Sequence, residues 1–183
     1  MKIRGAVVLI TGAAQGIGAA CASFFTEAGA RVALLDVDAE LGATAPHGAL
    51  TITGDITEDE VRRRFVNEAL ARYGRIDVLI NNVGVGQFGF PSEVDVEVSK
   101  RMFDVNVFSL IALTQLVLPE MRRRRSGAVV NIGSVGGEVG LPWAVMYCAT
   151  KWAVHCYTAV SYTHLDVYKR QQISLLPSIS APL

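Results

Sequence analysis

Residues 11–18 read Thr-Gly-Ala-Ala-Gln-Gly-Ile-Gly, and this glycine-rich stretch separates an apolar run, residues 6–10, from a segment of helical period, residues 16–28. A helix that begins in such a turn presents backbone N–H groups at its N-terminus, where they can hold a phosphate. Glycines leave room for the phosphate to approach that backbone. The stretch therefore predicts the first strand, turn and helix of a nucleotide-binding α/β fold.

Apolar runs of strand length alternate with helical segments along the chain, which is typical of βαβ units around a parallel sheet. The other strand candidates are residues 31–35, 50–53, 78–80 and 128–132. The other helical candidates are residues 58–73, 94–124 and 146 onward, with only a helical stub between residues 36 and 50. The strands are apolar throughout, as expected where helices cover both faces. We predict a Rossmann-like, doubly wound parallel sheet of the α/β class.

The composition allows one core and argues against several kinds of partner. The 183 residues are 51% hydrophobic and carry 17 basic and 17 acidic side chains, so no net field attracts nucleic acid or an anionic membrane. The longest apolar stretch, residues 107–118, is too short to span a bilayer. Cys21, Cys148 and Cys156 match neither a disulfide framework nor a metal spacing. We expect a cytoplasmic protein with no disulfide, no metal, and no membrane or nucleic-acid partner.

An acidic residue ends the second strand candidate, where a dinucleotide-binding fold holds a ribose. Asp36 can accept hydrogen bonds from both hydroxyls of the adenosine ribose. A 2′-phosphate there would meet like charge, and neither Gln15 nor Val37 supplies a cation to hold it. We therefore predict NAD as the cofactor, with NADP less favoured. A simple turn residue is the alternative interpretation of Asp36.

Two more strand ends supply polar residues at the same edge of the sheet. Asp55 follows the third strand candidate, and the run Asn-Asn-Val-Gly at 81–84 follows the fourth. Open α/β sheets bind ligands at this carboxyl edge. Taken alone, Asp55 could equally be the N-cap of the helix that begins near Glu58. The predicted cofactor-binding residues are Gly12, Gln15, Gly16, Ile17, Gly18, Asp36, Asp55, Ile56, Asn82, Gly84, Tyr147 and Lys151.

Ser134 follows the fifth strand candidate and precedes the run Tyr-Cys-Ala-Thr-Lys at 147–151. Positions i and i+4 share one face of a helix, so Tyr147 and Lys151 point the same way. An ammonium near a phenol favours the phenolate and lowers a pKa that is about 10 without a neighbour. Such a tyrosine can exchange a proton with an alcohol or a ketone.

From about residue 7 to residue 159 the chain resembles the classical short-chain dehydrogenase/reductase family. The resemblance rests on the glycine turn, Asp55, the Asn-Asn-x-Gly at 81–84, and the Tyr-x-x-x-Lys at 147–151. Asn106 and Ser134 also stand in the family's order and at its separations. Val83 is a small departure, because the family usually has alanine there.

The resemblance implies a catalytic tetrad of Asn106, Ser134, Tyr147 and Lys151. In that family the tyrosine is the acid/base on the substrate oxygen, and the serine hydrogen-bonds this oxygen. The lysine holds the nicotinamide ribose, and the asparagine positions a water in a proton relay. Asn106 also lies between two valines in a helical segment, where an asparagine is unfavourable unless it has a partner.

After residue 159 the resemblance ends. One codon choice for residues 160–171, preceded by the last two bases of a codon for Ala159, gives a DNA string equal to its own reverse complement, similar to two transposase mosaic ends joined head to head. We interpret residues 160–171 as translated sequencing adapter, and residues 160–183 as a non-native tail after a cofactor-binding domain at 1–159. A genuine divergent helix end is the alternative. The sheet is then expected to lack its last two strands and its substrate lid, which predicts little turnover and a tendency to aggregate.

The leading hypothesis for function is an oxidoreductase that transfers a hydride between NAD(H) and a secondary alcohol or ketone. Phe88, Phe90, Leu141 and Trp143 suggest a hydrophobic substrate. The resemblance implies a homodimer or homotetramer for the parent enzyme, meaning the natural protein from which residues 1–159 derive. A nucleotide-binding protein without catalysis is the alternative, and epimerases or dehydratases of the family share the same residues.

Overall fold

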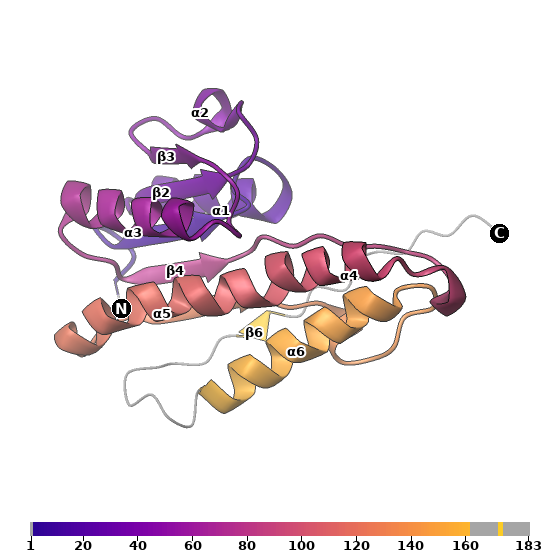
Figure 1. Cartoon of the computed structure of the whole chain (residues 1–183). Helices are drawn as coiled ribbons and strands as arrows, with labels where there is room; N and C mark the ends of the chain where they lie inside the picture. Colours follow the sequence, from indigo (N-terminus) through magenta and orange to yellow (C-terminus); the bar gives the residue numbers. More distant parts are fainter. Residues whose placement is uncertain (1, 162–171, 174–183) are drawn as a thin grey trace.

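Parallel strands form the centre of the fold in the computed structural model, which describes residues 2–161 and 172–173 (Figure 1). The five expected strands are β1 (Val7–Thr11), β2 (Arg31–Asp36), β3 (Leu50–Thr53), β4 (Val78–Asn81) and β5 (Ala128–Ile132). They lie in the order β3-β2-β1-β4-β5. The chain order reverses between β1 and β4, and a doubly wound sheet binds its ligand at that switch point.

A two-residue strand, Gln172–Ile173 (β6), pairs in parallel with β5 at Asn131 and Ile132. The sequence does not predict a strand there, because the residues after 159 carry none of the family's pattern. Of the segment interpreted as adapter, Val160 and Ser161 form the last turn of a helix. Residues 162–171 and 174–183 lie outside the described residues, so their non-native origin stays a prediction.

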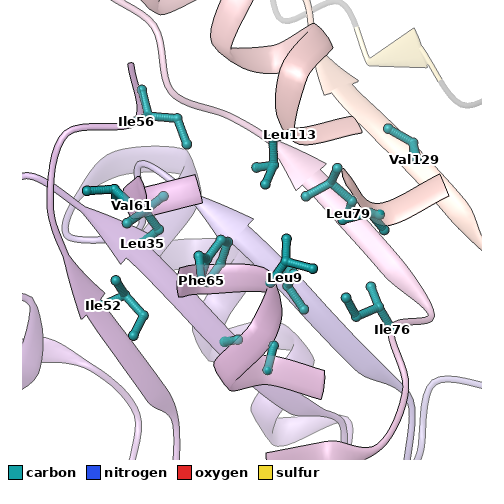
Figure 2. Packing of buried hydrophobic residues seen from close by; sticks show 14 of the residues in the cluster. Leu9, Leu35, Ile52, Ile56, Val61, Phe65, Ile76, Leu79, Leu113 and Val129 are labelled. Atoms are coloured by element: carbon teal, nitrogen blue, oxygen red, sulfur yellow. The ribbon is translucent and has the colours of Figure 1, made fainter. Parts of the chain in front are cut away.

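Helices cover both faces of the sheet, because alternate side chains of each strand point to opposite faces. On one face, α1 (Gly16–Glu27) and the short α2 (Leu41–Thr44) pack against Val8 and Ile10 of β1. On the other face, α3 (Asp59–Tyr73) and α5 (Ser109–Arg124) pack against Val7 and Leu9. Figure 2 shows Phe65 of α3 and Leu113 of α5 meeting Leu9 and Leu79 there.

The helix predicted at residues 94–124 begins as α4 (Val96–Phe103), passes through a π-helical segment η2 (Asp104–Phe108), and continues as α5. Figure 1 shows it running alongside α6 (Val145–Ser161), and the two meet through Val107, Leu110 and Val154. Two 3-10 turns, η1 (Pro91–Glu93) and η3 (Val135–Gly137), lie in the loops after β4 and β5.

By length and composition, the 29 residues of Val96–Arg124 could cross a membrane, whereas the apolar stretch 107–118 alone is too short to do so. Half of the most apolar window is buried inside the fold. Leu113, Val117 and Met121 belong to the core cluster on the sheet. A buried core helix of this kind meets the same criteria as a membrane span.

At the amino-terminal ends of β1 and β4, opposite the switch point, a buried carboxylate holds the strands together. Asp77 precedes β4 and is 1% exposed. It accepts hydrogen bonds from the backbone N of Val7 at 2.9 Å and from Arg124 at 2.7 Å, and Arg75 pairs with it as well. Burial acts to raise its pKa, but these hydrogen bonds hold the pKa of Asp77 below its usual range. The carboxylate therefore joins β1, β4 and the end of α5.

The core predicts a large stability cost for truncating Phe65, whose side chain is fully buried between α3 and the sheet. We expect Phe65→Ala to lower the free energy of unfolding by about 3 to 5 kcal/mol, because it leaves a cavity. Phe24→Ala is the control, since Phe24 is 58% exposed and only makes an edge contact with Phe25. We expect that control to cost about 1 kcal/mol or less in urea unfolding. Equal losses for both variants would contradict this account of the core.

Candidate active site

Asn82 fastens the glycine turn to the end of β4. Its side-chain amide donates to the carbonyl oxygens of Thr11 at 3.0 Å and Gly12 at 2.9 Å. Its backbone N donates to the Thr11 hydroxyl at 3.0 Å, and the backbone N of Val83 donates to the same oxygen at 3.2 Å. Asn82, predicted to contact the cofactor, therefore acts on the turn itself, and its partner is Thr11, the first residue of the glycine-rich stretch.

The glycine turn is packed on one side and open on the other. A side chain on Gly18 would collide with the carbonyl oxygen of Gly12, whereas a Cβ built on Gly16 meets no atom within 4 Å. Gly16 has a φ of +56°, a conformation that glycine adopts without strain. Gln15 and Ile17 flank it and are exposed. This open backbone at the N-terminus of α1 fits a pyrophosphate.

Asp36 ends β2 beside this turn and is held by backbone donors. One carboxylate oxygen accepts from the N of Ala14 at 2.9 Å, and the other accepts from the N of Asp38 at 3.1 Å. The first bond ties the carboxylate to the glycine turn, so Asp36 has a structural partner there beyond the role of a plain turn residue. Each oxygen keeps a lone pair for a ribose hydroxyl.

Asp55 follows β3 and does not cap α3, whose N-cap is Glu58. One of its oxygens accepts from the backbone N and from the hydroxyl of Thr57, both at 2.8 Å, and the other pairs with Arg101. Burial acts to raise the pKa of Asp55, but these bonds hold it below the usual range. The neighbouring Ile56 buries its side chain in the core, and its carbonyl oxygen accepts from Arg62 at 2.8 Å.

Lys151 lies on the same side of α6 as Tyr147 and is 6% exposed. Its Nζ donates to the carbonyl oxygen of Ile132 at 3.0 Å and lies 5.9 Å from the centre of the Tyr147 ring. A Cβ on Gly84 would approach this Nζ to 3.4 Å, so a glycine there gives the ammonium its room. Burial lowers the pKa of Lys151 to about 8.

Asn106 has the partners that its buried position requires. It is 1% exposed and lies in the π-helical segment η2. Its Oδ1 accepts from the N of Val85, and its Nδ2 donates to the carbonyl oxygen of Val85, both at 2.8 Å. Nδ2 also donates to the hydroxyl of Thr150 at 2.9 Å, and that hydroxyl donates to the carbonyl oxygen of Tyr147 at 2.7 Å. π-helical segments of this kind occur frequently at functional sites.

Ser134 lies two residues after β5 and is the N-cap of η3, where its Oγ accepts from the backbone N of Gly136 at 3.1 Å. Because this bond uses an acceptor position, the hydroxyl proton stays available for another oxygen. Ser134 lines one small cavity together with Lys151 and His155. Hydrogen bonds and shared packing thus bring the four predicted catalytic residues to one end of the sheet.

Buried polar residues behind the site are a feature that sequence reasoning misses. Asn81 and Asn131 occupy paired positions on β4 and β5, and their side chains hydrogen-bond at 2.8 Å. Asn81 also donates to Thr114 at 3.1 Å, and Asn131 donates to Thr158 at 2.9 Å. The signal that could have found them is an asparagine at the end of two apolar strand runs, since a buried amide requires partners.

Two loops beside Tyr147 are joined by a hydrogen bond from the N of Gly89 to the carbonyl oxygen of Trp143 at 2.8 Å. Trp143 has a φ of +60°, which is strained for a residue with a side chain. The ring of Phe88 lies 6.4 Å from the ring of Tyr147, measured between centres. These loops border the tyrosine's side of the site with exposed aromatic side chains.

A family model described as short chain dehydrogenase matches residues 6–175. The chain belongs to the short-chain dehydrogenase/reductase family. The matched range runs past residue 159, where the resemblance carried by the sequence motifs ends. Among curated relatives, dehydrogenase/reductase SDR family member 7B from Bos taurus is 39% identical over 168 residues, which covers 85% of this chain and 52% of that protein.

Two solved structures, a dehydrogenase and a reductase, match the fold closely. An NAD⁺-bound xylitol dehydrogenase superposes with a TM-score of 0.90 at 28% identity, covering 96% of this chain and 72% of its own. A 3-ketoacyl-(acyl-carrier-protein) reductase from Brucella melitensis, complexed with NADH, gives 0.89 at 27% identity, covering 95% and 76%. The chain spans about half the length of the curated relatives first matched.

The buried ammonium of Lys151 predicts a particular pH dependence of stability. Its folded pKa is about 8 and its unfolded value is 10.5. Between these values the unfolded chain binds a proton that the folded chain does not, so the lysine's contribution to stability rises with pH in that window. We expect the wild-type free energy of unfolding, minus that of Lys151→Met, to increase from pH 8 to pH 10 in urea titrations. A difference that stays flat over this range would refute the shifted pKa.

Proposed function

We propose that this chain is the cofactor-binding and catalytic part of an oxidoreductase that transfers a hydride between NAD(H) and a secondary alcohol or ketone. The observation that carries the proposal is the buried ammonium of Lys151 on the same helix face as Tyr147, close to Asn106 and Ser134. Bound nicotinamide would supply or accept the hydride. A phenol beside a buried ammonium has no use in a protein that only binds a nucleotide.

Each member of this group has a separate task in the proposed reaction. Tyr147 moves a proton between its hydroxyl and the substrate oxygen, and the ammonium of Lys151 lies 5.9 Å from the centre of its ring. The Ser134 hydroxyl, which already accepts from Gly136, donates a hydrogen bond to the same substrate oxygen. Asn106 keeps the segment after β4 against α6 through Val85 and Thr150. Positioning and electrostatics are therefore the contributions of these side chains.

NAD is the favoured nucleotide because Asp36 lies beside the glycine turn. Its carboxylate is tied to Ala14 and repels a 2′-phosphate on the ribose. Two of the matched structures are complexes with NADH and NAD⁺, which supports a nicotinamide nucleotide.

The proposed substrate carries hydrophobic groups beside its alcohol or ketone carbon. Phe88, Phe90 and Trp143 are 72%, 56% and 60% exposed, and the first of these lies near the Tyr147 ring. An apolar substituent can cover them and exclude water from the reacting oxygen. For the parent enzyme we propose a cytoplasmic homodimer or homotetramer, supported by exposed Phe108 and Trp152 on neighbouring helices.

Replacement of Tyr147 by Phe separates catalysis from binding. The change removes the hydroxyl and keeps the ring, so we expect the turnover, which is already predicted to be small in this chain, to fall about a hundredfold or more, the range of general acid/base catalysis. NADH affinity should stay within about twofold, because the ring and its neighbours remain. Turnover is followed as NADH oxidation with a panel of hydrophobic ketones, and affinity by NADH fluorescence. Unchanged turnover in Tyr147→Phe would favour a non-catalytic nucleotide-binding protein.

Removing the charge of Asp36 should relax the choice of nucleotide. We expect Asp36→Ala to raise the affinity for NADPH relative to NADH about tenfold, since like-charge repulsion of the 2′-phosphate disappears. Asp38→Ala is the matched control, because Asp38 is exposed and caps the N of Glu40 at 2.9 Å. Its affinity ratio should stay at the wild-type value. A ratio that shifts equally in both variants points to a general field effect.

A further inference from the structure

Arg101 projects from α4 onto the segment that follows β3, 46 residues earlier in the chain. One guanidinium nitrogen pairs with Oδ2 of Asp55, and another donates to the Thr57 hydroxyl at 2.6 Å. The same hydroxyl donates to Oδ1 of Asp55 at 2.8 Å. The guanidinium, the hydroxyl and the carboxylate therefore form a closed set of contacts that leaves Asp55 one orientation.

The contacts leave a defined acceptor position on Asp55. Oδ1 accepts from the backbone N and from the hydroxyl of Thr57, which fills both of its lone pairs. Oδ2 receives Arg101 and keeps its second lone pair. The carboxyl stays ionised at neutral pH, because hydrogen bonds hold its pKa below the usual range against the effect of burial.

The position of Asp55 in the sheet indicates which part of a dinucleotide this acceptor meets. β3 pairs with β2, with Thr53 opposite Asp36, and the N of Gly54 donates to the carbonyl oxygen of Asp36 at 2.9 Å. Asp55, two residues after β3, therefore lies close to the end of β2 at which Asp36 stands. A base attached to a ribose held by Asp36 extends over this segment, and adenine carries an exocyclic amine that can donate.

We propose that Arg101 is a positioning residue for adenine: it orients Asp55 so that the second lone pair of Oδ2 accepts from the exocyclic amine. The proposal rests on the nucleotide site of the proposed function and adds a residue from a different part of the chain. The alternative is a surface ion pair with no ligand, since Arg101 is 52% exposed and such pairs add little to stability.

The test compares NADH with nicotinamide hypoxanthine dinucleotide in its reduced form, which has a carbonyl in place of the amine. Both bind through the same phosphates, riboses and nicotinamide, so their affinity ratio reports on the amine edge of the base, where hypoxanthine also has an N–H in place of the acceptor N1. Affinities are measured by nucleotide fluorescence on the wild-type chain and on Arg101→Met. We expect Arg101→Met to lose about fivefold in NADH affinity, the value of one partly exposed charged hydrogen bond. Affinity for the hypoxanthine analogue should change by less than about twofold.

Two further variants keep the test independent of folding. Lys100→Met removes the same charge from the neighbouring position of α4, where Lys100 pairs with Glu97 of its own helix at 2.8 Å. It should leave both affinities unchanged. Arg101→Lys keeps the charge but cannot reach Asp55 and Thr57 with separate fork nitrogens, so it should lie between wild type and Arg101→Met. Thermal unfolding of each variant verifies the fold.

Each outcome decides a different point. Equal losses for both dinucleotides in Arg101→Met, or no loss for either, would overturn the positioning role of Arg101. A wild-type chain that binds both dinucleotides equally well would show that Asp55 does not receive the amine, and the proposed oxidoreductase would stand without this inference. A wild-type chain that binds neither would remove the proposed function and the inference together.

Discussion

The side-chain amide of Asn106 is the contact on which the arrangement of the site depends. It accepts from the backbone N of Val85 and donates to the carbonyl oxygen of Val85, the two bonds that a residue of a neighbouring strand would make. A third hydrogen bond is donated to Thr150 on α6. Three segments far apart in sequence therefore meet at one planar group. Because the amide is 1% exposed, water cannot replace a lost partner, and each bond is costly to break. The π-helical turn brings the amide to that meeting point.

The ammonium of Lys151 poses the opposite problem, since a charge in the interior is unfavourable unless it is paired or hydrogen-bonded. Here the lysine donates to one strand-end carbonyl and lies close to an aromatic ring, with no carboxylate among the contacts described for its Nζ in residues 2–161. Its lowered pKa is the result. A lysine that releases its proton readily is suited to a site where protons are exchanged, so a loss of stability accompanies chemical competence.

Much of the fold is predictable from the sequence, because apolar runs and helix ends are local signals. The five long strands begin and end within a residue of the predicted bounds. The site's supporting contacts are different. Thr11 with Asn82, and Arg101 with Asp55, join positions 71 and 46 residues apart. Such pairs depend on strand register and helix orientation, which no local pattern encodes. The π-helical turn is hidden as well, since its sequence continues the helical period.

The hydrogen bond between Gly89 and Trp143 couples the conformations of the two loops beside Tyr147. With the carbonyl of Trp143 held by the other loop at a strained φ of +60°, a change in the path of one loop breaks this hydrogen bond unless the other loop moves with it. Ordering one of them lowers the entropy that the other must lose when a ligand arrives. A replacement of one loop is thus expected to remove this hydrogen bond, whereas a matched replacement of both loops can keep it.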